Sequence, residues 1–385
     1  MVCGNEHALG RTQQFFVANE AICGSIQKPV STDAAKILSA SLAVEQERKS
    51  RDDKRLTRSL LERITGKASA PWSCESYLLP SGTAGTPPDM HQLLYAVFGA
   101  YTNTPATSDV YTLSTMATGP RSNTIYAATG SGGATPIVME AIVGAFADIW
   151  GLSVSGGDEP KMTFEGWGTQ HVHTGNSLVV SIASADVTVT AGEGENFELG
   201  SLVQVGSDDN GGAGYLVIGV VGDVVTLEAA PTASPTDPIV PFVPAETTAG
   251  NPVNGVTGDI TIGGFNLPIT AFDVSVNNAL KPTDDEAFEQ YPTDAIVQRR
   301  TVTGNISLRA RKDAIILLGQ RKAFNTHAIV VTMGSGAGTT VTVNIPYAEY
   351  DFAALEVPEA DEAVISLPFT ALGSSGEDEI TLSFT

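Results

Sequence analysis

The sequence predicts a mainly β protein of amphipathic strands with one α-helix packed against the sheet. Three observations support this fold class. Apolar and polar residues alternate over many stretches, as they do in half-buried strands. Only 17 % of the residues are charged, against a usual share of about a quarter, while 39 glycines and 21 prolines indicate many turns. A chain of 385 residues can bury a sizeable core and form two or three domains.

Two strands are predicted near the start of the chain, over residues 34–45 and 68–79. In the first, alternate residues fall on one apolar face: Leu38, Ala40, Leu42 and Val44. In the second, Trp72 and Cys74 share a face opposite Ser73. Between them, residues 45–55 are a charge run that stays polar to Lys67, which cannot be core. We therefore expect a long projecting loop there.

The best helix signal follows these strands. Thr86-Pro-Pro-Asp89 offers a cap, a proline for the first turn and an acid for the helix dipole. Apolar residues then repeat at helical spacing (Met90, Leu93, Leu94, Val97), and Gly99 can end the helix. Beyond it, the alternation on both sides of the turn at 156–158 predicts a hairpin.

The middle of the chain predicts an inserted domain. Residues 162–280 contain 13 acidic residues and no Lys or Arg. Short strands are predicted at 201–205, 214–220 and 224–228, and six prolines between Pro231 and Pro252 indicate a linker. We therefore divide the chain into a first part (1–174), an inserted small β-barrel-like domain (175–252) and a second part (253–385).

The second part returns to long amphipathic strands. Their apolar residues alternate along the chain: Phe272, Val274 and Val276; Val302, Ile306 and Leu308; Ile329, Val331 and Met333; Val341, Val343 and Ile345; Ile380, Leu382 and Phe384. The third and fourth sets flank the glycine-rich turn at 334–338 and predict a hairpin. A short helix is predicted over 313–322.

Charge and targeting signals bound the class of protein. With 21 basic and 43 acidic residues the net charge is −22, so the chain should be soluble and repel nucleic acid at a distance. Three widely spaced cysteines (Cys3, Cys23, Cys74) suggest neither a disulfide framework nor a zinc site. No signal peptide is evident, and the apolar run 136–152 falls short of a membrane span. We expect synthesis in the cytoplasm and no membrane partner.

The candidate chemical sites are weak. His171 and His173 have the spacing of metal ligands on one strand face, but two surface histidines are the favoured interpretation. The segment 208–212 resembles a calcium loop without its full set of oxygen ligands, so we interpret it as a hairpin turn. The glycine runs at 130–133 and 334–338 lack the helix and lysine of a phosphate site. We expect no catalytic residue, no cofactor, no metal and no enzymatic activity.

Three segments resemble the tail tube proteins (major tail proteins) of long-tailed, non-contractile bacteriophages. They are residues 52–89, which include Glu62-Arg-Ile-Thr-Gly-Lys67 and Trp72-Ser-Cys-Glu-Ser-Tyr; residues 272–281, Phe-Asp-Val-Ser-Val-Asn-Asn-Ala-Leu-Lys; and residues 368–382, which include Leu372-Gly-Ser-Ser-Gly-Glu. Each is a pattern of strand and turn, and together they lie on both sides of the insertion.

The resemblance implies a structural virion protein. Members of the family fold as a β-sandwich or half-barrel with one packed α-helix, and six copies form a hexameric ring in which the sheets join into a barrel. The rings stack into a helical tube through which DNA leaves the virion. The expected location is the virion tail, after synthesis in the host cytoplasm. The expected partners are further copies of the chain and other tail proteins at the tube ends, while phage DNA passes through the lumen without specific binding.

The charge run supplies the candidate subunit interface. Residues 48–67 carry eight basic and three acidic residues on an otherwise acidic chain, so the segment suits an acidic neighbouring subunit. The interface hypothesis comprises Glu45, Glu47, Arg48, Lys49, Arg51, Asp52, Asp53, Lys54, Arg55 and Arg58. A solvated loop is the simpler alternative. At the level of function, the alternatives are a capsid-decoration or other β-rich surface protein, and a carbohydrate-active enzyme on a β scaffold.

Overall fold

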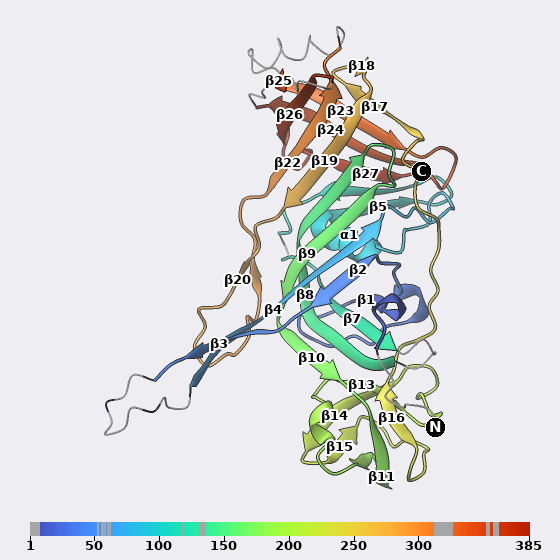
Figure 1. Ribbon diagram of the computed structural model, residues 1–385, viewed down its shortest axis with the longest axis vertical. Coiled ribbons are helices and arrows are strands. Elements are labelled where there is room, and N and C mark those ends of the chain that lie inside the picture. The colour runs from blue at the N-terminus through green and yellow to red at the C-terminus, as the bar shows by residue number, and fades with distance from the viewer. Residues whose placement is uncertain are drawn as a thin grey trace.

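The computed structural model describes residues 8–51, 54, 59, 63–117, 119–130, 136–311, 326–351, 355–356 and 362–385. Within these ranges the prediction of a mainly β protein is confirmed, and the one α-helix described is α1 (His91–Phe98). The molecule is elongated in Figure 1, with a small barrel at one end of its long axis and the strands of the second part at the other.

The strands before the insertion are β1 (Gln14–Asn19), β2 (Ser39–Leu42), β3 (Glu45–Lys49), β4 (Ile64–Tyr77), β5 (Gly99–Thr104), β6 (Ser108–Leu113), β7 (Ser122–Gly130), β8 (Pro136–Ser155), β9 (Lys161–Gly168) and β10 (Gln170–Thr174). The inserted segment contains β11 (Ser177–Ala183), β12 (Asp186–Val189), β13 (Leu202–Val205), β14 (Tyr215–Val221), β15 (Val224–Leu227) and β16 (Pro238–Pro241). After it come β17 (Gly258–Ile262), β18 (Phe265–Asn266), β19 (Ile269–Asn277), β20 (Lys281–Pro282), β21 (Ala295–Ile296), β22 (Thr301–Arg309), β23 (Thr326–Met333), β24 (Val341–Tyr350), β25 (Leu355–Glu356), β26 (Val364–Ala371) and β27 (Thr381–Phe384).

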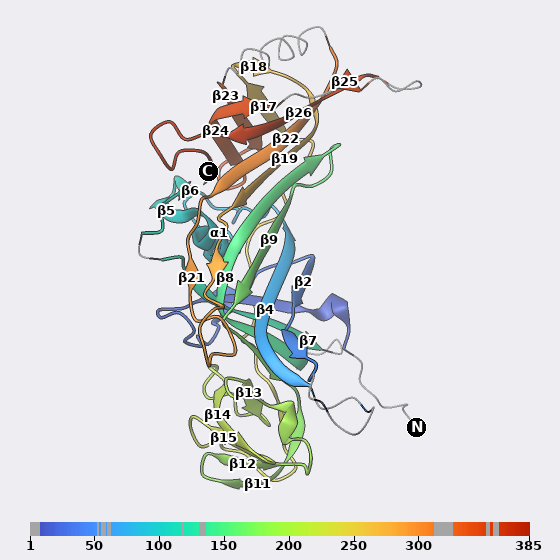
Figure 2. The same cartoon turned by 90° about the vertical axis from the view of Figure 1, so that its left-hand side faces the viewer.

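One antiparallel path of strands organises the body. The path runs β2–β4–β9–β8–β19–β22–β26–β24–β27–β6–β5. Strand β8, which is 20 residues long, is the fourth strand of this path, and Figure 2 shows β4, β9 and β8 side by side. Because the path turns back on itself between β26 and β24, residues of both halves share one apolar core.

The alternation in sequence sets which face of each strand is buried. Trp72 and Cys74 of β4 face the core, as predicted, and so do the apolar residues predicted for β19, β22, β23, β24 and β27. A strand turns successive side chains to opposite faces, so burial of one alternating set leaves the polar set outside. The hairpins predicted around residues 156–158 and 334–338 are β8–β9 and β23–β24.

Helix α1 packs against β8, β6 and β5 on the core side of the sheet. Its buried face carries Leu93, Leu94 and Val97, and Gly99 adopts a left-handed conformation (φ 82°) that ends the helix, as predicted. The predicted N-terminal cap is wrong. The helix begins at His91 after Met90, with no side-chain cap, and the Asp89 carboxylate instead accepts a hydrogen bond from the Ala249 amide at 3.0 Å.

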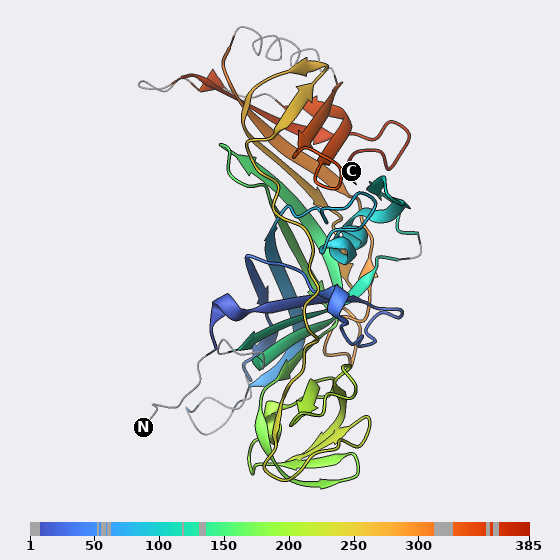
Figure 3. The same ribbon diagram turned by 90° about the vertical axis from the view of Figure 1, so that its right-hand side faces the viewer.

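Strands β11 to β16 close into a six-stranded barrel in the order β11–β12–β15–β14–β13–β16, hereafter the inserted barrel. It has its own apolar core, which includes Val187, Val203 and Val225. Its base packs on the body through Leu202 and Phe242, which lie in one buried cluster with Phe16. The chain then runs from the inserted barrel across the body to β17, as Figure 3 shows.

Four local predictions need correction or fall outside the described residues. The strand predicted over 34–45 is the shorter β2, and Leu38 and Val44 of its predicted face are exposed because nothing packs over the ends of β2. Part of the predicted loop over 45–67 is β3 paired with β4. Part of the proline-rich linker is β16, where Pro238 and Pro241 occupy the ends of the strand. The helix predicted over 313–322 lies outside the described residues.

A buried carboxylate fixes the N-terminal strand to the sheet. Glu20 follows β1, and its two oxygens accept hydrogen bonds from the Ser122 hydroxyl at 2.8 Å, the Thr124 hydroxyl at 2.7 Å, the Gly24 amide at 3.0 Å and the Gly144 amide at 2.8 Å. All four neighbours donate, so only a group that accepts at both oxygens suits the site.

We therefore expect Glu20→Gln to lower the free energy of unfolding by about 2–4 kcal/mol. The amide nitrogen of glutamine would replace one of the two oxygens and would face a hydroxyl and a backbone amide that both donate hydrogen bonds. Urea unfolding at neutral pH measures this change. The matched control is Glu159→Gln at an exposed position, which should change stability by less than about 0.5 kcal/mol. Equal effects of the two substitutions would show that Glu20 is not a fixed anchor.

A half-buried histidine gives the fold a pH dependence. The Nδ1 atom of His91 lies 2.8 Å from the Tyr111 hydroxyl, and the nearby Asp109 carboxylate accepts a 2.5 Å hydrogen bond from Tyr101. Burial lowers the pKa of His91 from 6.5 to about 4; Asp109 opposes this change and Arg121 adds to it.

Since the unfolded chain binds this proton more tightly, His91 stabilises the fold fully above pH 6.5, and this contribution is lost as the pH falls toward 4. The loss amounts to at most about 3 kcal/mol. Other groups also titrate in this range, so the measurement is the difference in urea midpoints between wild type and His91→Asn from pH 7 to 4.5. The two curves should converge as the pH falls, and parallel curves would contradict the prediction.

Candidate assembly surfaces

A two-stranded ribbon projects from the sheet at the charge run. Strand β3 pairs with the first residues of β4 in the register Glu45↔Ser69, Gln46↔Ala68 and Lys49↔Ile64. Strand β9 pairs with β4 only from Ala70 onward, so β3 and residues 64–69 of β4 extend beyond the sheet. We call these two paired stretches the arm, which projects sideways from the body in Figure 1.

The base of the arm is fixed by a neighbouring loop. The Lys67 ammonium donates to the carbonyl of Glu289 at 2.6 Å and to that of Glu286, and the Ala68 amide donates to the Gln290 carbonyl at 2.8 Å. Backbone oxygens that hold a lysine in this way restrict the angle at which the ribbon leaves the sheet. No sequence signal identified this loop as the support of the arm.

The structure places part of the predicted interface on the arm. Glu45, Glu47, Arg48 and Lys49 lie in β3 and are exposed, and Lys49 pairs with Glu47 at 3.2 Å. Arg51 and Lys54 are exposed close by, while Asp52, Asp53, Arg55 and Arg58 lie outside the described residues. Exposed ion pairs are worth little in water, so these charges are available to a partner at small cost.

The strand path of the body ends in two open edges. Within the described residues, β2 pairs with β4 alone and β5 pairs with β6 alone. A strand at an edge keeps a row of unpaired backbone donors and acceptors that another strand can complete. The two edges belong to different strands and stand at opposite ends of the path, which suits contact between the edge of one copy and the other edge of the next.

The side of the sheet turned away from the core forms a polar surface over six strands, hereafter the outer face. Its members are exposed or half-buried: Ser73, Glu75, Tyr77, Gly151, Ser153, Lys161, Thr163, Glu165, Asp273, Ser275, Asn277, Thr301, Thr303, Asn305, Ser307, Arg309, Ser366, Pro368 and Thr370. One row crosses all six strands, in the order Glu75, Thr163, Gly151, Ser275, Thr303 and Thr370.

The outer face is rich in hydroxyls and nearly neutral. It carries three carboxylates (Glu75, Glu165, Asp273) and two cations (Lys161, Arg309), a net charge of −1. Lys161 pairs with Glu75 at 3.1 Å, which neutralises part of this charge locally. In the sequence, Ser, Thr and Asn alternate with apolar residues along these strands, which indicates one polar face for each strand. The pairing of β8 with β19, which joins the two halves of the outer face, has no local signal in the sequence.

The two histidines of β10 converge on one carboxylate. Glu140 of β8 lies 2.6 Å from His171 Nε2 and 3.0 Å from His173 Nδ1. Burial alone raises the pKa of Glu140, but hydrogen bonds from both histidines bring it below its usual value. The prediction of two surface histidines is wrong for His171, whose side chain is only 11 % exposed because it lies against Glu140. No group of three or more His, Cys, Asp and Glu side chains in the described ranges could hold a metal ion.

The acidic turn and the glycine loops have structural roles. The segment 208–212 is the turn between β13 and β14, as predicted, and Asp208 accepts hydrogen bonds from the Asn210 amide, the Thr232 amide and the Tyr215 hydroxyl. Residues 334–338 connect β23 to β24. Of the run 130–133, only Gly130 lies within the described residues, at the end of β7.

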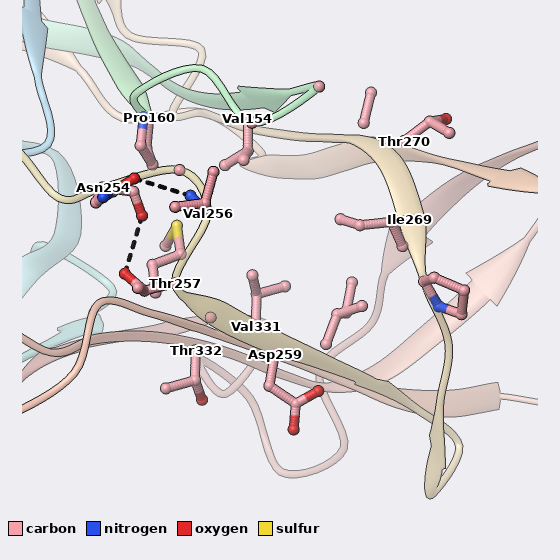
Figure 4. A pocket seen from close by; sticks show the side chains of 18 of the residues that line it. Val154, Pro160, Asn254, Val256, Thr257, Asp259, Ile269, Thr270, Val331 and Thr332 are labelled. Carbon is pink, nitrogen blue, oxygen red and sulfur yellow. Dashed lines mark hydrogen bonds between the residues drawn. The ribbon is translucent and has the colours of Figure 1, made fainter.

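A pocket of about 270 Å³ lies between the β8–β9 turn and strands β17 and β19 (Figure 4). Two of its polar residues stabilise their own turn, since Asn254 accepts from the Val256 amide at 3.0 Å and the Thr257 hydroxyl donates to the Asn254 carbonyl at 3.1 Å. Asp259 is its one charged residue. General acid–base catalysis by a carboxylate pair would need a second such group in the pocket, and its lining supplies none.

Comparison with known proteins adds no further assignment. Among the described residues, no helix is both long and apolar enough to span a bilayer. The chain matches no protein-family model, and a search of curated proteins finds no similar sequence.

Proposed function

We propose that this protein is the tail tube subunit of a long-tailed, non-contractile bacteriophage. Six copies would close into a ring, and rings would stack into a tube that conducts DNA. The observation that carries the proposal is the outer face, a hydroxyl-rich and uncovered surface six strands wide, on a sheet whose strand path has two open ends.

The open ends support a ring rather than a two-fold dimer. Joining β2 of one copy to β5 of the next uses two different surfaces, and repeated contacts of this kind close into a ring if the rotation allows. Closure would satisfy both edges and produce a continuous barrel, which removes exposed edges altogether. The strand path of the body supports this arrangement, since among the described residues its end strands β2 and β5 do not pair with each other.

The chemistry of the outer face supports the channel role. Short hydroxyl side chains keep a bore wide, and a net charge of −1 per subunit leaves no excess of cations for DNA phosphates. A protein that neutralises phosphates with lysine or arginine gains affinity through counterion release at every contact. A surface without an excess of such cations lets the duplex slide.

The arm supports stacking or lateral contacts between subunits. It projects beyond the sheet, is fixed at its base by Lys67 and carries exposed charges of both signs. Such a ribbon contributes little to the core of its own chain. Its shape and charge suit a neighbouring copy with an acidic surface.

The proposal is tested on the purified full chain by sedimentation velocity and negative-stain electron microscopy over a range of concentrations. Rings with six-fold symmetry, and tubes at higher concentration, are expected. A chain that remains monomeric at every concentration would contradict the proposal. Binding to phage capsids without rings would favour the capsid-decoration alternative, and immunogold labelling of virions distinguishes tail from capsid.

A further inference from the structure

The inserted barrel is the most uniformly acidic part of the chain. Its residues 177–241 contain nine acidic residues and no Lys or Arg, so no positive charge within it offsets them. The arm carries charges of both signs: the acids Glu45 and Glu47, and the exposed cations Arg48 and Lys49. Arg63, which directly precedes the second stretch of the arm, is a further exposed cation.

Several barrel carboxylates already serve the barrel itself. Asp223 accepts from the Gly192 amide at 2.8 Å, Glu193 accepts from the Ser177 hydroxyl at 2.6 Å, and Glu228 pairs with Lys28. Two others lie exposed on the surface. Glu195 lies in the short helical turn after β12, and the Asp186 carboxylate accepts a hydrogen bond from the Thr226 hydroxyl at 2.7 Å. These two are the best placed to meet a cation from outside.

The arm and the inserted barrel lie toward the same end of the molecule. In Figures 1 and 2 the arm slopes from the middle of the body toward the barrel end of the long axis. In a ring whose subunits stand side by side with their long axes parallel, an arm that projects sideways therefore meets the neighbour near the level of its barrel.

We propose that the inserted barrel is the docking surface for the exposed cations on and beside the arm of the neighbouring copy. The occupant is a second copy of this chain, and the attraction is between these cations, with Arg48, Lys49 and Arg63 foremost, and the uncompensated barrel carboxylates, with Asp186 and Glu195 foremost. The inference rests on the proposed ring, and it assigns the insertion a role in holding that ring together. Complementary charges of this kind favour the correct register and speed association.

The test is a charge swap in the full chain. Arg48→Glu with Lys49→Glu should raise the concentration needed for half-assembly by about tenfold or more, since attraction becomes repulsion. Asp186→Lys with Glu195→Lys should do the same. The four substitutions together should restore assembly to near the wild-type concentration, because the sign of both partners is then inverted.

The matched control is Glu159→Lys with Asp259→Lys, which makes the same change in net charge at exposed positions away from the barrel. It should leave the concentration for half-assembly close to wild type. If wild type forms rings but the four substitutions together assemble no better than either pair, the docking inference fails while the proposed function stands. If wild type forms no rings, the proposed function fails first.

Zero-length cross-linking of lysine to carboxylate gives an independent measurement. Because the barrel contains no lysine, every cross-link to one of its carboxylates identifies a partner elsewhere. Lys28–Glu228 is the internal control, since these side chains meet within one chain. In rings of mixed ¹⁴N and ¹⁵N chains, links from Lys49 or Lys54 to the barrel should join light to heavy peptides. Barrel links that join only peptides of one label would overturn the inference.

Discussion

Replacing residues 47–67 by Asn-Gly is expected to yield a folded monomer that forms neither rings nor tubes. Gln46 and Ala68 are cross-strand neighbours, so a two-residue turn can join them without disturbing the ladder. The deletion removes most of the arm and leaves Trp72 and Cys74 of β4 in the core. Circular dichroism and urea unfolding report the fold, and sedimentation velocity reports assembly.

Two variants separate the arm itself from its support. Lys67→Ala removes the hydrogen bonds to the loop that includes Glu286 and Glu289 but keeps the arm. We expect it to assemble at a concentration a few times higher than wild type, because the arm is then less well oriented. Tubes of normal length from the deletion variant would show that the arm has no part in assembly.

The sequence was sufficient for the fold class because the signals are local. Alternation in β19, β22 and β24 follows directly from the burial of one face, and the positive φ of Gly99 needs a residue without a side chain. The closed barrel lies where the short strands and the cation-free composition predicted an insertion. These features depend on neighbours along the chain.

The errors arise where distant segments decide the structure. Residues 45–49 were predicted to be a solvated loop because all five are charged or polar, yet they pair with β4 in a register that the local sequence does not fix. His171 read as a surface residue because its contact, Glu140, lies on another strand. Asp89 was predicted to supply an acid for the helix dipole, but its carboxylate accepts a hydrogen bond from the amide of Ala249, which lies 160 residues further along the chain.

The candidate surfaces were predictable only in part. The charge run pointed to the arm, since a mixed run cannot be buried. The outer face could not be assembled from the sequence, because its six strands are brought together by pairings such as β8 with β19 and β22 with β26. The near neutrality of the outer face also differs from the strongly acidic composition of the chain as a whole. The chain outside residues 48–67 carries −27, but the surface that we propose to line the channel carries only −1.

Cations placed on the outer face are expected to make the tube bind DNA. Thr163→Lys, Ser275→Lys and Thr303→Lys lie in one row across three strands, and together they change the net charge of this face from −1 to +2 in each subunit. Stacked rings would then present a continuous line of cations to the phosphates. Release of condensed counterions favours binding, and its magnitude falls steeply with salt.

The measurement uses tubes assembled from each variant and a short fluorescent DNA duplex that sediments with them only when bound. Wild-type tubes should leave the duplex in solution, while the triple-lysine tubes should retain it with an affinity that falls by about tenfold or more between low and physiological salt. The matched control replaces the same three residues by glutamine, which adds bulk without charge and should retain no DNA. Equal retention by the lysine and glutamine tubes would show that the outer face does not contact DNA, and the channel would then be lined by another surface.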